Sequence, residues 1–309
     1  YLSFDADVKG GNVAGVVALD SGGSTLSEIT VGFNPAPSIA TLKNYDMNAI
    51  LLAEHANNVG GLVAESFGTN IVNCVAQMNI RSCATNLGGL VGYSHTIDNW
   101  NETGSYPPLT TIVSSCYYGT IDATVDKDTN IKSIGGLVGQ LANGAINNSR
   151  TYLLNANKEI DDTKVATIRF NTRYTNNNNI NVGGLVGLAN ADVSQKSESI
   201  GFTNCEVLIN LEAVNNGSGN ALYVGYVAGN ARSANFTMIT INNGRRLNAG
   251  NIVVNDFYYG GMAGYGLNVT VSESTVLADV KLDNIKAVKI NAGSAFGKLD
   301  ATSSSKISG

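Results

Sequence analysis

The stretch INVGGLVGLAN, residues 180–190, holds three glycines within five residues, with apolar side chains on both sides. Taken alone, this segment suits a ligand-binding loop, a membrane-crossing segment or a structural element. Its recurrence decides the question. A core of two small residues, a large apolar residue, an apolar residue and a small residue returns along the chain. Eight copies begin at residues 14, 60, 88, 135, 183, 225, 260 and 293.

The spacing between these copies varies while the core stays the same. Successive starts are 46, 28, 47, 48, 42, 35 and 33 residues apart. A constant core with a variable period is typical of stacked supersecondary units, in which insertions leave the stack as loops. The sequence therefore predicts a single repeat domain over residues 1–309.

The repeated units are expected to be extended. The cores are short, rich in valine and bounded by asparagine and glycine. Each glycine would also destabilise a helix by about 1 kcal/mol relative to alanine. We therefore predict an all-β fold, a parallel β-helix or β-solenoid of about eight coils with loop excursions. At a strand spacing of about 4.8 Å, such a rod is on the order of 40 Å long.

Each core is predicted to be a strand buried on both faces. In the copy at 183, alternation places Val182 and Val186 on one face around Gly184, and Leu185 on the other. The glycines then permit either close approach of a neighbouring backbone or a corner. Further extended segments follow the cores, as at 71–75 and 112–116, so we expect two to three strands per coil.

Composition narrows the class of partner. Charged residues make up 14% of the chain, the net charge is −5, and the basic residues are scattered. Because nucleic acids and anionic membranes attract clustered Lys and Arg, neither is an expected partner. No apolar run reaches the roughly 18 residues needed to span a bilayer, so we expect no membrane span. Coil-like sequence near both ends predicts a segment of a longer chain, or a subunit that joins others head to tail.

The repeat resembles a known family. GGLVG followed by a turn and a strand like Thr203-Asn204-Cys205 is similar to the GLUG repeat of bacterial surface proteins. The likeness is best over residues 59–211. The resemblance implies an extracellular or cell-surface scaffold without catalytic activity, in the manner of an adhesin stalk or a filament subunit. Its partners would be copies of itself, or a protein or glycan of a host or cell surface.

Catalytic and cofactor motifs are absent from the sequence. The two histidines, His55 and His95, lack metal-ligand spacing, and we interpret them as surface or loop residues. The segment 293–299 is one residue short of a phosphate loop. The alternative function is a carbohydrate-active β-helix enzyme, which needs grouped carboxylates. The one adjacent acidic pair, Asp161-Asp162, lies in a polar excursion and favours a solvated turn. We predict no catalytic residue, no metal site and no cofactor.

The cysteines are predicted to be buried free thiols. Cys74, Cys116 and Cys205 fall at one position of the second strand, where other coils carry Ser149 or Ser274. Replacement by serine favours a column of small residues over obligatory bridges. In-register neighbours on parallel strands also suit disulfide geometry poorly. Cys83 stands outside this column.

Partner binding is predicted for the excursion at residues 93–111. It holds the one tryptophan, Trp100, with Asn99 and Tyr106 beside it. Such aromatic side chains stack on sugar rings or anchor a protein, although Trp100 could instead cover the core beneath the loop. The candidate N-glycosylation sequons are Asn101, Asn147, Asn216, Asn235 and Asn268. A chain of this composition would contain about this many sequons by chance.

Overall fold

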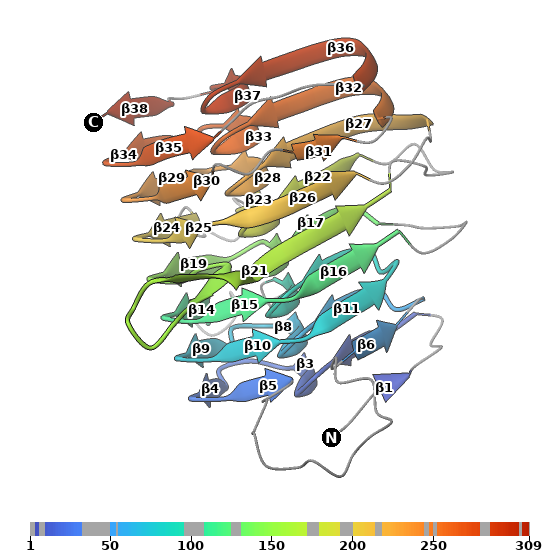
Figure 1. Ribbon diagram of the computed structural model, residues 1–309, viewed down its shortest axis with the longest axis vertical. Coiled ribbons are helices and arrows are strands. Elements are labelled where there is room, and N and C mark those ends of the chain that lie inside the picture. The colour runs from blue at the N-terminus through green and yellow to red at the C-terminus, as the bar shows by residue number, and fades with distance from the viewer. Residues whose placement is uncertain are drawn as a thin grey trace, which may run out of the picture.

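The protein is a β-solenoid whose coils follow one another along a single rod (Figure 1). The computed structural model describes residues 4–5, 10–32, 50–53, 55–95, 108–124, 131–171, 179–191, 200–213, 218–243, 247–249, 252–278, 285–302 and 305–308. Over these residues the chain forms strands and turns and has no helix. The predicted fold class is therefore confirmed, and no helix of these residues is long and apolar enough to cross a membrane.

Equivalent strands of successive coils stack into sheets, which we name A to E in the order of the chain. Sheet A contains β1 (Phe4–Asp5), β6 (Ile50–Ala53), β11 (Asn79–Ser82), β16 (Thr120–Ala123), β21 (Ile160–Phe170), β26 (Ile209–Ala213) and β31 (Leu247–Ala249). Sheet B contains β2 (Asn12–Ala14), β7 (Asn58–Gly60), β12 (Asn86–Gly88), β17 (Ser133–Gly135), β22 (Ile180–Gly183), β27 (Ser218–Gly225), β32 (Ile252–Gly260) and β36 (Ile285–Gly293).

The other three sheets complete each coil. Sheet C contains β3 (Val17–Asp20), β8 (Val63–Ser66), β13 (Val91–Ser94), β18 (Val138–Leu141), β23 (Val186–Asn190), β28 (Ala228–Arg232), β33 (Ala263–Leu267) and β37 (Phe296–Asp300). Sheet D contains β4 (Thr25–Ser27), β9 (Asn70–Val72), β14 (Thr110–Val113), β19 (Gly144–Asn147), β24 (Ile200–Thr203), β29 (Ala234–Thr237), β34 (Thr270–Ser272) and β38 (Lys306–Ser308). Sheet E contains β5 (Thr30–Gly32), β10 (Val75–Gln77), β15 (Cys116–Tyr118), β25 (Glu206–Val207), β30 (Thr240–Asn243) and β35 (Thr275–Ala278), its halves joined by bridges at Arg150.

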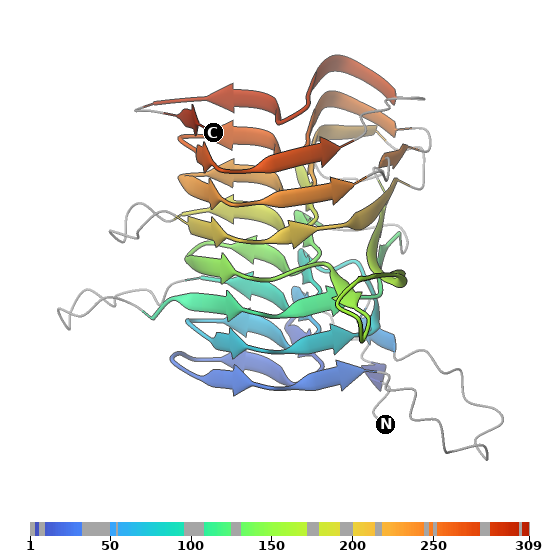
Figure 2. The ribbon, with the colours of Figure 1, turned by 60° about the vertical axis from the view of Figure 1, so that its left-hand side comes forward.

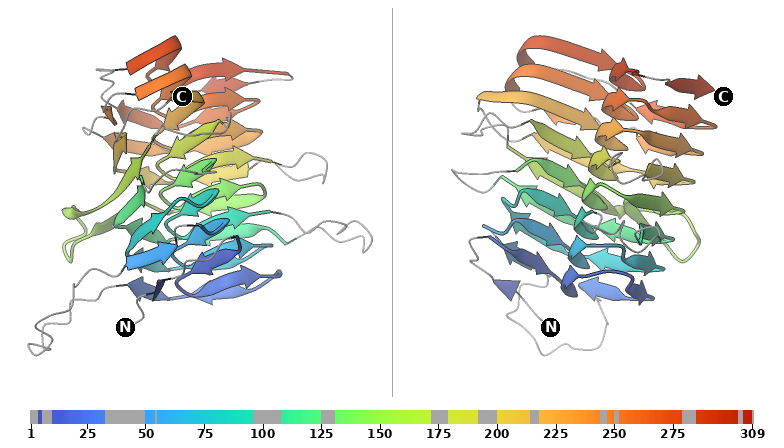
Figure 3. Two further views of the ribbon diagram at one scale, coloured as in Figure 1. Left: turned by 90° about the vertical axis from the view of Figure 1, so that its right-hand side faces the viewer. Right: turned by 180° about the vertical axis from the view of Figure 1, so that it is seen from behind.

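The eight strands in each of sheets B, C and D confirm the predicted number of coils. Figures 2 and 3 show the coils in chain order from one end of the rod to the other. Every strand pair is parallel except β20 (Tyr152–Leu154) with β21, which form a hairpin on the side of the rod. Most coils have five strands, so the expectation of two to three strands per coil was wrong.

The GGLVG core is a corner, which corrects the prediction of one straight strand. Strand β22 ends at Gly183 and β23 begins at Val186, with Gly184 and Leu185 between them. The corners stack as regularly as the strands, because Leu185 and Val186 both donate backbone hydrogen bonds to the carbonyl of Val227, at 3.0 and 2.9 Å. The assignment of alternating faces across the core was therefore also wrong, because alternation stops at the bend.

Glycine is required at this corner because three backbones come close together. A Cβ built on Gly88 would lie 1.8 Å from the carbonyl oxygen of Val91, across the corner. A Cβ on Gly92 would lie 2.8 Å from the backbone nitrogen of Val59 in sheet B. Sheets B and C thus pack backbone against backbone, so both roles foreseen for the glycines, close approach and a corner, are confirmed.

A second two-residue corner joins sheets D and E. Segments 71–75 and 112–116, predicted as single strands, each divide there. The first residue of this corner has a left-handed φ of about 50–57° in seven coils, at Glu28, Asn73, Ser114, Asn148, Asn204, Met238 and Glu273. The second residue turns into the core, which in this column includes completely buried Cys74 and Cys205.

The interior is one continuous apolar cluster made of stacked columns. The leucines of four successive B–C corners, Leu62, Leu90, Leu137 and Leu185, are completely buried. In sheet D the buried column runs through Ile71, Ile112, Ile146, Phe202 and Phe236. The residues of each column are far apart in the sequence but pair in register. Burial of their apolar area therefore fixes the stacking of the coils.

Candidate functional site

The predicted partner-binding residues Asn99, Trp100 and Tyr106 lie outside the described residues, as do the sequons at Asn101 and Asn216. The remaining sequons all lie on sheet D or beside it. Asn235 is exposed on β29, and Asn147 on β19 and Asn268 after β33 are half-buried. These three side chains lie at the surface of the rod, where glycosylation stays a prediction.

His95 and Asp161 each contact neighbouring side chains of the rod. His95 Nε2 lies 2.8 Å from Glu65 Oε1, and the His95 ring stacks on Tyr93 at 4.4 Å. Asp161 accepts a hydrogen bond from Thr163 and pairs with Lys164 at 3.1 Å, on the hairpin strand β21. The acidic pair therefore lies in a strand and not in the predicted turn. Among the described residues, no three acidic, His or Cys side chains gather as metal ligands would.

None of the four cysteines forms a disulfide and all are buried, as predicted. Burial raises the pKa of Cys205 to about 11, and burial also raises that of Cys116 to about 11 although nearby Arg150 opposes it. Cys74 shares a column with Ser115, whose Oγ accepts the Cys74 backbone N–H at 3.0 Å. Cys116 lies one residue further along and pairs with Val75, so its place in that column was wrong.

The surface feature that could bind a partner is a groove between sheets B and C. Two columns line it, one from each sheet. The column of sheet B is Asn12, Asn58, Asn86, Ser133, Asn181, Tyr223, Tyr258 and Asn291. The column of sheet C is Leu19, Glu65, Tyr93, Gln140, Leu188, Asn230, Tyr265 and Lys298. We call this feature the polar groove.

Contacts across the polar groove show that the two columns face each other. Asn12 Nδ2 donates a hydrogen bond of 2.5 Å to Glu65 Oε2 at one end. The rings of Tyr223 and Tyr265 meet at 5.9 Å near the other. Along sheet B, Asn86 Nδ2 donates to Asn58 Oδ1 at 2.8 Å, and Asn58 donates in turn to Asn12 at 3.0 Å.

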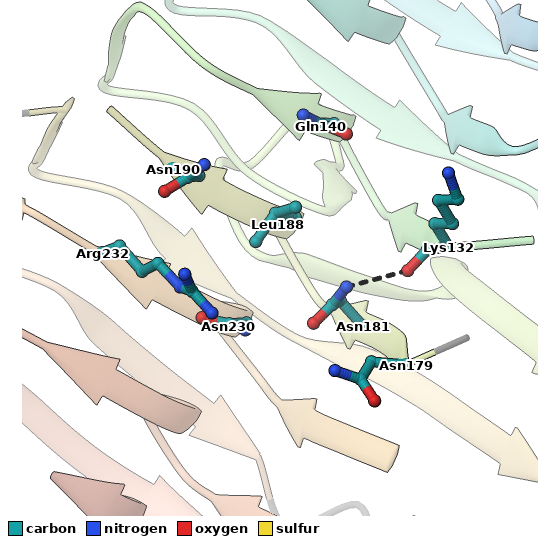
Figure 4. A pocket seen from close by; sticks show the side chains of 8 residues that line it. All are labelled: Lys132, Gln140, Asn179, Asn181, Leu188, Asn190, Asn230 and Arg232. Carbon is teal, nitrogen blue, oxygen red and sulfur yellow. Dashed lines mark hydrogen bonds between the residues drawn. The ribbon is translucent and has the colours of Figure 1, made fainter. Parts of the chain in front are cut away.

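The middle of the groove widens into a pocket of about 230 Å³. It is lined by Lys132, Gln140, Asn179, Asn181, Leu188, Asn190, Asn230 and Arg232 (Figure 4). Among the described residues, this lining is rich in amides, carries two cations and includes no carboxylate. Leu188 is half-buried and gives the pocket its one apolar side chain.

Two of the pocket amides hold buried oxygens without partners. Asn181 and Asn230 are each 5% exposed, and the Oδ1 atom of each has no hydrogen bond. The orientation of the Asn181 amide is set by its Nδ2, which donates to the carbonyl of Lys132 at 2.9 Å. A buried acceptor without a donor costs about 1–3 kcal/mol, so these oxygens mark a place where a donor is missing.

A tyrosine cluster continues the groove beyond the pocket. Tyr223 stacks on Tyr258 at 4.7 Å, and Tyr265 leans on Tyr223. Cations surround these rings: Arg232 and Lys298 lie 6.0 and 5.5 Å from the ring of Tyr265. Burial raises the pKa of Tyr223, and neighbouring Tyr258 raises it further, so its phenol stays protonated at neutral pH. Lys298 also pairs with Asp300 at 2.5 Å, so the cluster offers flat faces with charges of both signs beside them.

The sequence contains a periodic signal for the sheet B side of this groove. The sheet B column lies two residues before the first small residue of each core, as in Asn58-Val59-Gly60, Asn86-Leu87-Gly88 and Asn181-Val182-Gly183. A recurrent asparagine there breaks an apolar run at a fixed place. Comparison of the chain with protein-family models, with curated proteins and with solved structures gives no match.

Proposed function

We propose that the protein is a non-catalytic structural scaffold of an extracellular or cell-surface location, a β-solenoid rod that serves as a stalk or filament subunit. The resemblance of its cores to GLUG repeats supports this proposal. The observation that carries it is the state of the last coil, where interior columns end in exposed apolar side chains.

Two apolar columns that are buried in earlier coils become exposed in the last coil. In sheet D, Ile112 and Ile146 are completely buried, whereas Ile307 at the end of the same column is 58% exposed. In sheet B, Phe257 is completely buried and its neighbour Ile290 is 47% exposed. Strands β36, β37 and β38 also end their sheets with an unpaired backbone edge. A further coil would bury these side chains and pair this edge at once.

We infer that a further coil meets this edge, supplied by a second copy in a head-to-tail manner or by more of the same chain. The first coil offers matching features, with sheet edges at β2, β3 and β4 and exposed Val16 and Leu19. Stacking of parallel edges would continue sheets B, C and D across the joint. Such a heterologous contact does not close on itself, so it yields filaments.

The alternative of a carbohydrate-active β-helix enzyme has less support. Glycoside hydrolysis commonly uses two carboxylates that flank the scissile bond. The pocket in the polar groove is lined by amides, cations and one leucine. This lining favours binding over cleavage.

The proposal is tested by the assembly state. We expect sedimentation velocity to show species that grow with concentration, and electron microscopy to show rods longer than one molecule. The double variant Ile290→Lys/Ile307→Lys places charges on the end face and should remain monomeric. Val288→Lys is the matched control, because Val288 is 88% exposed and lies beside exposed Asn255, outside the buried columns. A wild-type protein that stays monomeric at every concentration, or a double variant that assembles normally, would exclude end-to-end assembly.

A further inference from the structure

We propose that the pocket in the polar groove binds a carboxylated sugar residue of an acidic polysaccharide. This site is separate from the rod ends, so the inference goes beyond the scaffold function and does not depend on it. Four properties of the described residues lead to this ligand class: missing donors, positive charge, pocket size and the neighbouring rings.

The missing donors require a ligand with hydroxyl or N–H groups. Asn181 Oδ1 and Asn230 Oδ1 accept no hydrogen bond although both side chains are 95% buried. Vicinal sugar hydroxyls donate and accept, so they match these oxygens together with the amides of Gln140, Asn179 and Asn190. A fully ionised anion such as sulfate has no proton to give to either asparagine.

The charges of the lining require an acidic group on the same ligand. Lys132 and Arg232 both line the pocket, on the sheet B and sheet C sides, and Figure 4 shows their side chains at its rim. Both residues are exposed, so they are free to reorient toward a ligand. The planar Arg232 guanidinium matches a carboxylate with two parallel hydrogen bonds. A neutral sugar would leave this part of the lining without a counter-charge.

The pocket size indicates one monosaccharide unit at a time. Its volume of about 230 Å³ is below the range of roughly 300–1,000 Å³ that holds drug-sized ligands. Leu188 gives a small apolar surface for the C–H face of a sugar ring.

The tyrosine cluster extends the site to a chain of sugars. Tyr223 pairs in register with Asn181, and Tyr265 with Asn230, so the rings lie one coil beyond the pocket. Adjacent coils are about 4.8 Å apart. A sugar chain that runs along the groove would therefore place its next residue against Tyr223 or Tyr265. Half-buried aromatic faces of this kind pack well against C–H surfaces.

The test is calorimetric titration with trigalacturonate, set against its methyl ester, which keeps the same sugar chain but lacks the charges, and against a sulfated trisaccharide. We expect saturable binding of trigalacturonate and binding at least tenfold weaker for both comparison sugars. Binding should also weaken as salt is added. Absence of saturable binding at millimolar trigalacturonate, or equal affinity for the ester or the sulfated sugar, would overturn the proposal.

Variants of the lining locate the site. Arg232→Gln and Asn230→Leu should each weaken trigalacturonate binding at least tenfold. Arg169→Gln is the control, because Arg169 pairs with Glu212 on sheet A, outside the groove, and it should bind as the wild type does. Since Asn230 is buried, Gln140→Leu serves as a second apolar substitution at a half-buried position, with circular dichroism to show that each variant folds. Unchanged affinity in both Arg232→Gln and Gln140→Leu would place any sugar site elsewhere.

Discussion

The ring of Tyr117 lies directly over Gly89, so that a Cβ built on Gly89 would be 2.2 Å from Tyr117 Cγ. Tyr117 is completely buried, and its hydroxyl donates a hydrogen bond of 2.9 Å to the carbonyl of Met78. The second glycine of the core therefore faces the interior, where it leaves room for a side chain of sheet E. The neighbouring coil has smaller Ala76 opposite Gly61, at 3.1 Å.

Gly89→Ala should lower the free energy of unfolding by about 3 kcal/mol, because the new methyl overlaps both a buried ring and the Gly136 carbonyl oxygen. Gly201→Ala is the matched control. A Cβ on Gly201 would meet only the Ala145 methyl, at an ordinary contact distance of 3.7 Å. Urea denaturation checks both variants. Equal stability of the two would contradict the packing described for Tyr117.

Met238→Asn should raise the free energy of unfolding by about 1 kcal/mol. Met238 has a φ of 52° at the D–E corner, so it bears left-handed strain, and it is 41% exposed. Asparagine tolerates this conformation better and occupies the same corner at Asn204 in the preceding coil. Thermal and urea unfolding measure the gain. Thr237→Asn, on the adjacent extended residue, should not stabilise the protein.

Cys205→Ser should change the free energy of unfolding by less than about 1 kcal/mol, because serine occupies the same column at Ser149 and Ser274. The native thiols should also resist iodoacetamide at pH 8, since burial raises the pKa of Cys205 and Cys116 to about 11. Mass spectrometry would count the alkylated residues before and after unfolding. Rapid labelling of the folded protein would contradict the burial of these groups.

The stabilisation that ionised Asp20 gives the fold should be lost in acid. Burial raises the pKa of its carboxyl, but hydrogen bonds from Thr69 at 2.5 Å and Ser24 at 2.7 Å outweigh this and hold the pKa below its usual value. The stabilisation is therefore fully present above pH about 4 and is lost as the pH falls through the lowered pKa. Asp20→Asn should cost about 2 kcal/mol at pH 7.

The measurement is urea denaturation of both proteins at pH 7 and pH 3. The difference between wild type and Asp20→Asn should shrink at pH 3, where the wild-type carboxyl takes up a proton. Ser27→Ala, on the exposed end of β4, should show the same small effect at both values. A gap between wild type and Asp20→Asn that grows in acid would reverse the sign of this argument.

The coil number and the stacking could be predicted because the small-residue cores recur and cannot form a helix. The exact position of the bend could not, because side-chain alternation assumes a continuous strand, and Gly183 and Gly184 suit both a corner and a close backbone approach. At the D–E corner, Asn73, Asn148 and Asn204 were a usable turn signal. Ser114 and Met238 obscured it, since the surrounding stack imposes the left-handed backbone on residues that do not favour it.

The polar groove could not be predicted from motifs, because its two columns come from every coil and meet only when sheets B and C fold against each other. The orphan oxygens of Asn181 and Asn230 depend on burial, which no local pattern reveals. The aromatic residues of the groove are also not adjacent in the sequence. Trp100 is recognisable in the sequence as the single tryptophan, whereas Tyr223, Tyr258 and Tyr265 come together from three different strands only in the fold.

The two corners of fixed length restrict insertions to the other links between the strands. Between sheets B and C, and between D and E, each link is two residues long, as at Gly61-Leu62 and Asn73-Cys74. The C-to-D links run instead from one residue at Ser233 to fifteen between β13 and β14. Peptides inserted into that longest link should therefore be displayed without altering the register of the strands. Insertion into the C-to-D link of another coil would place the same peptide at a different position along the rod.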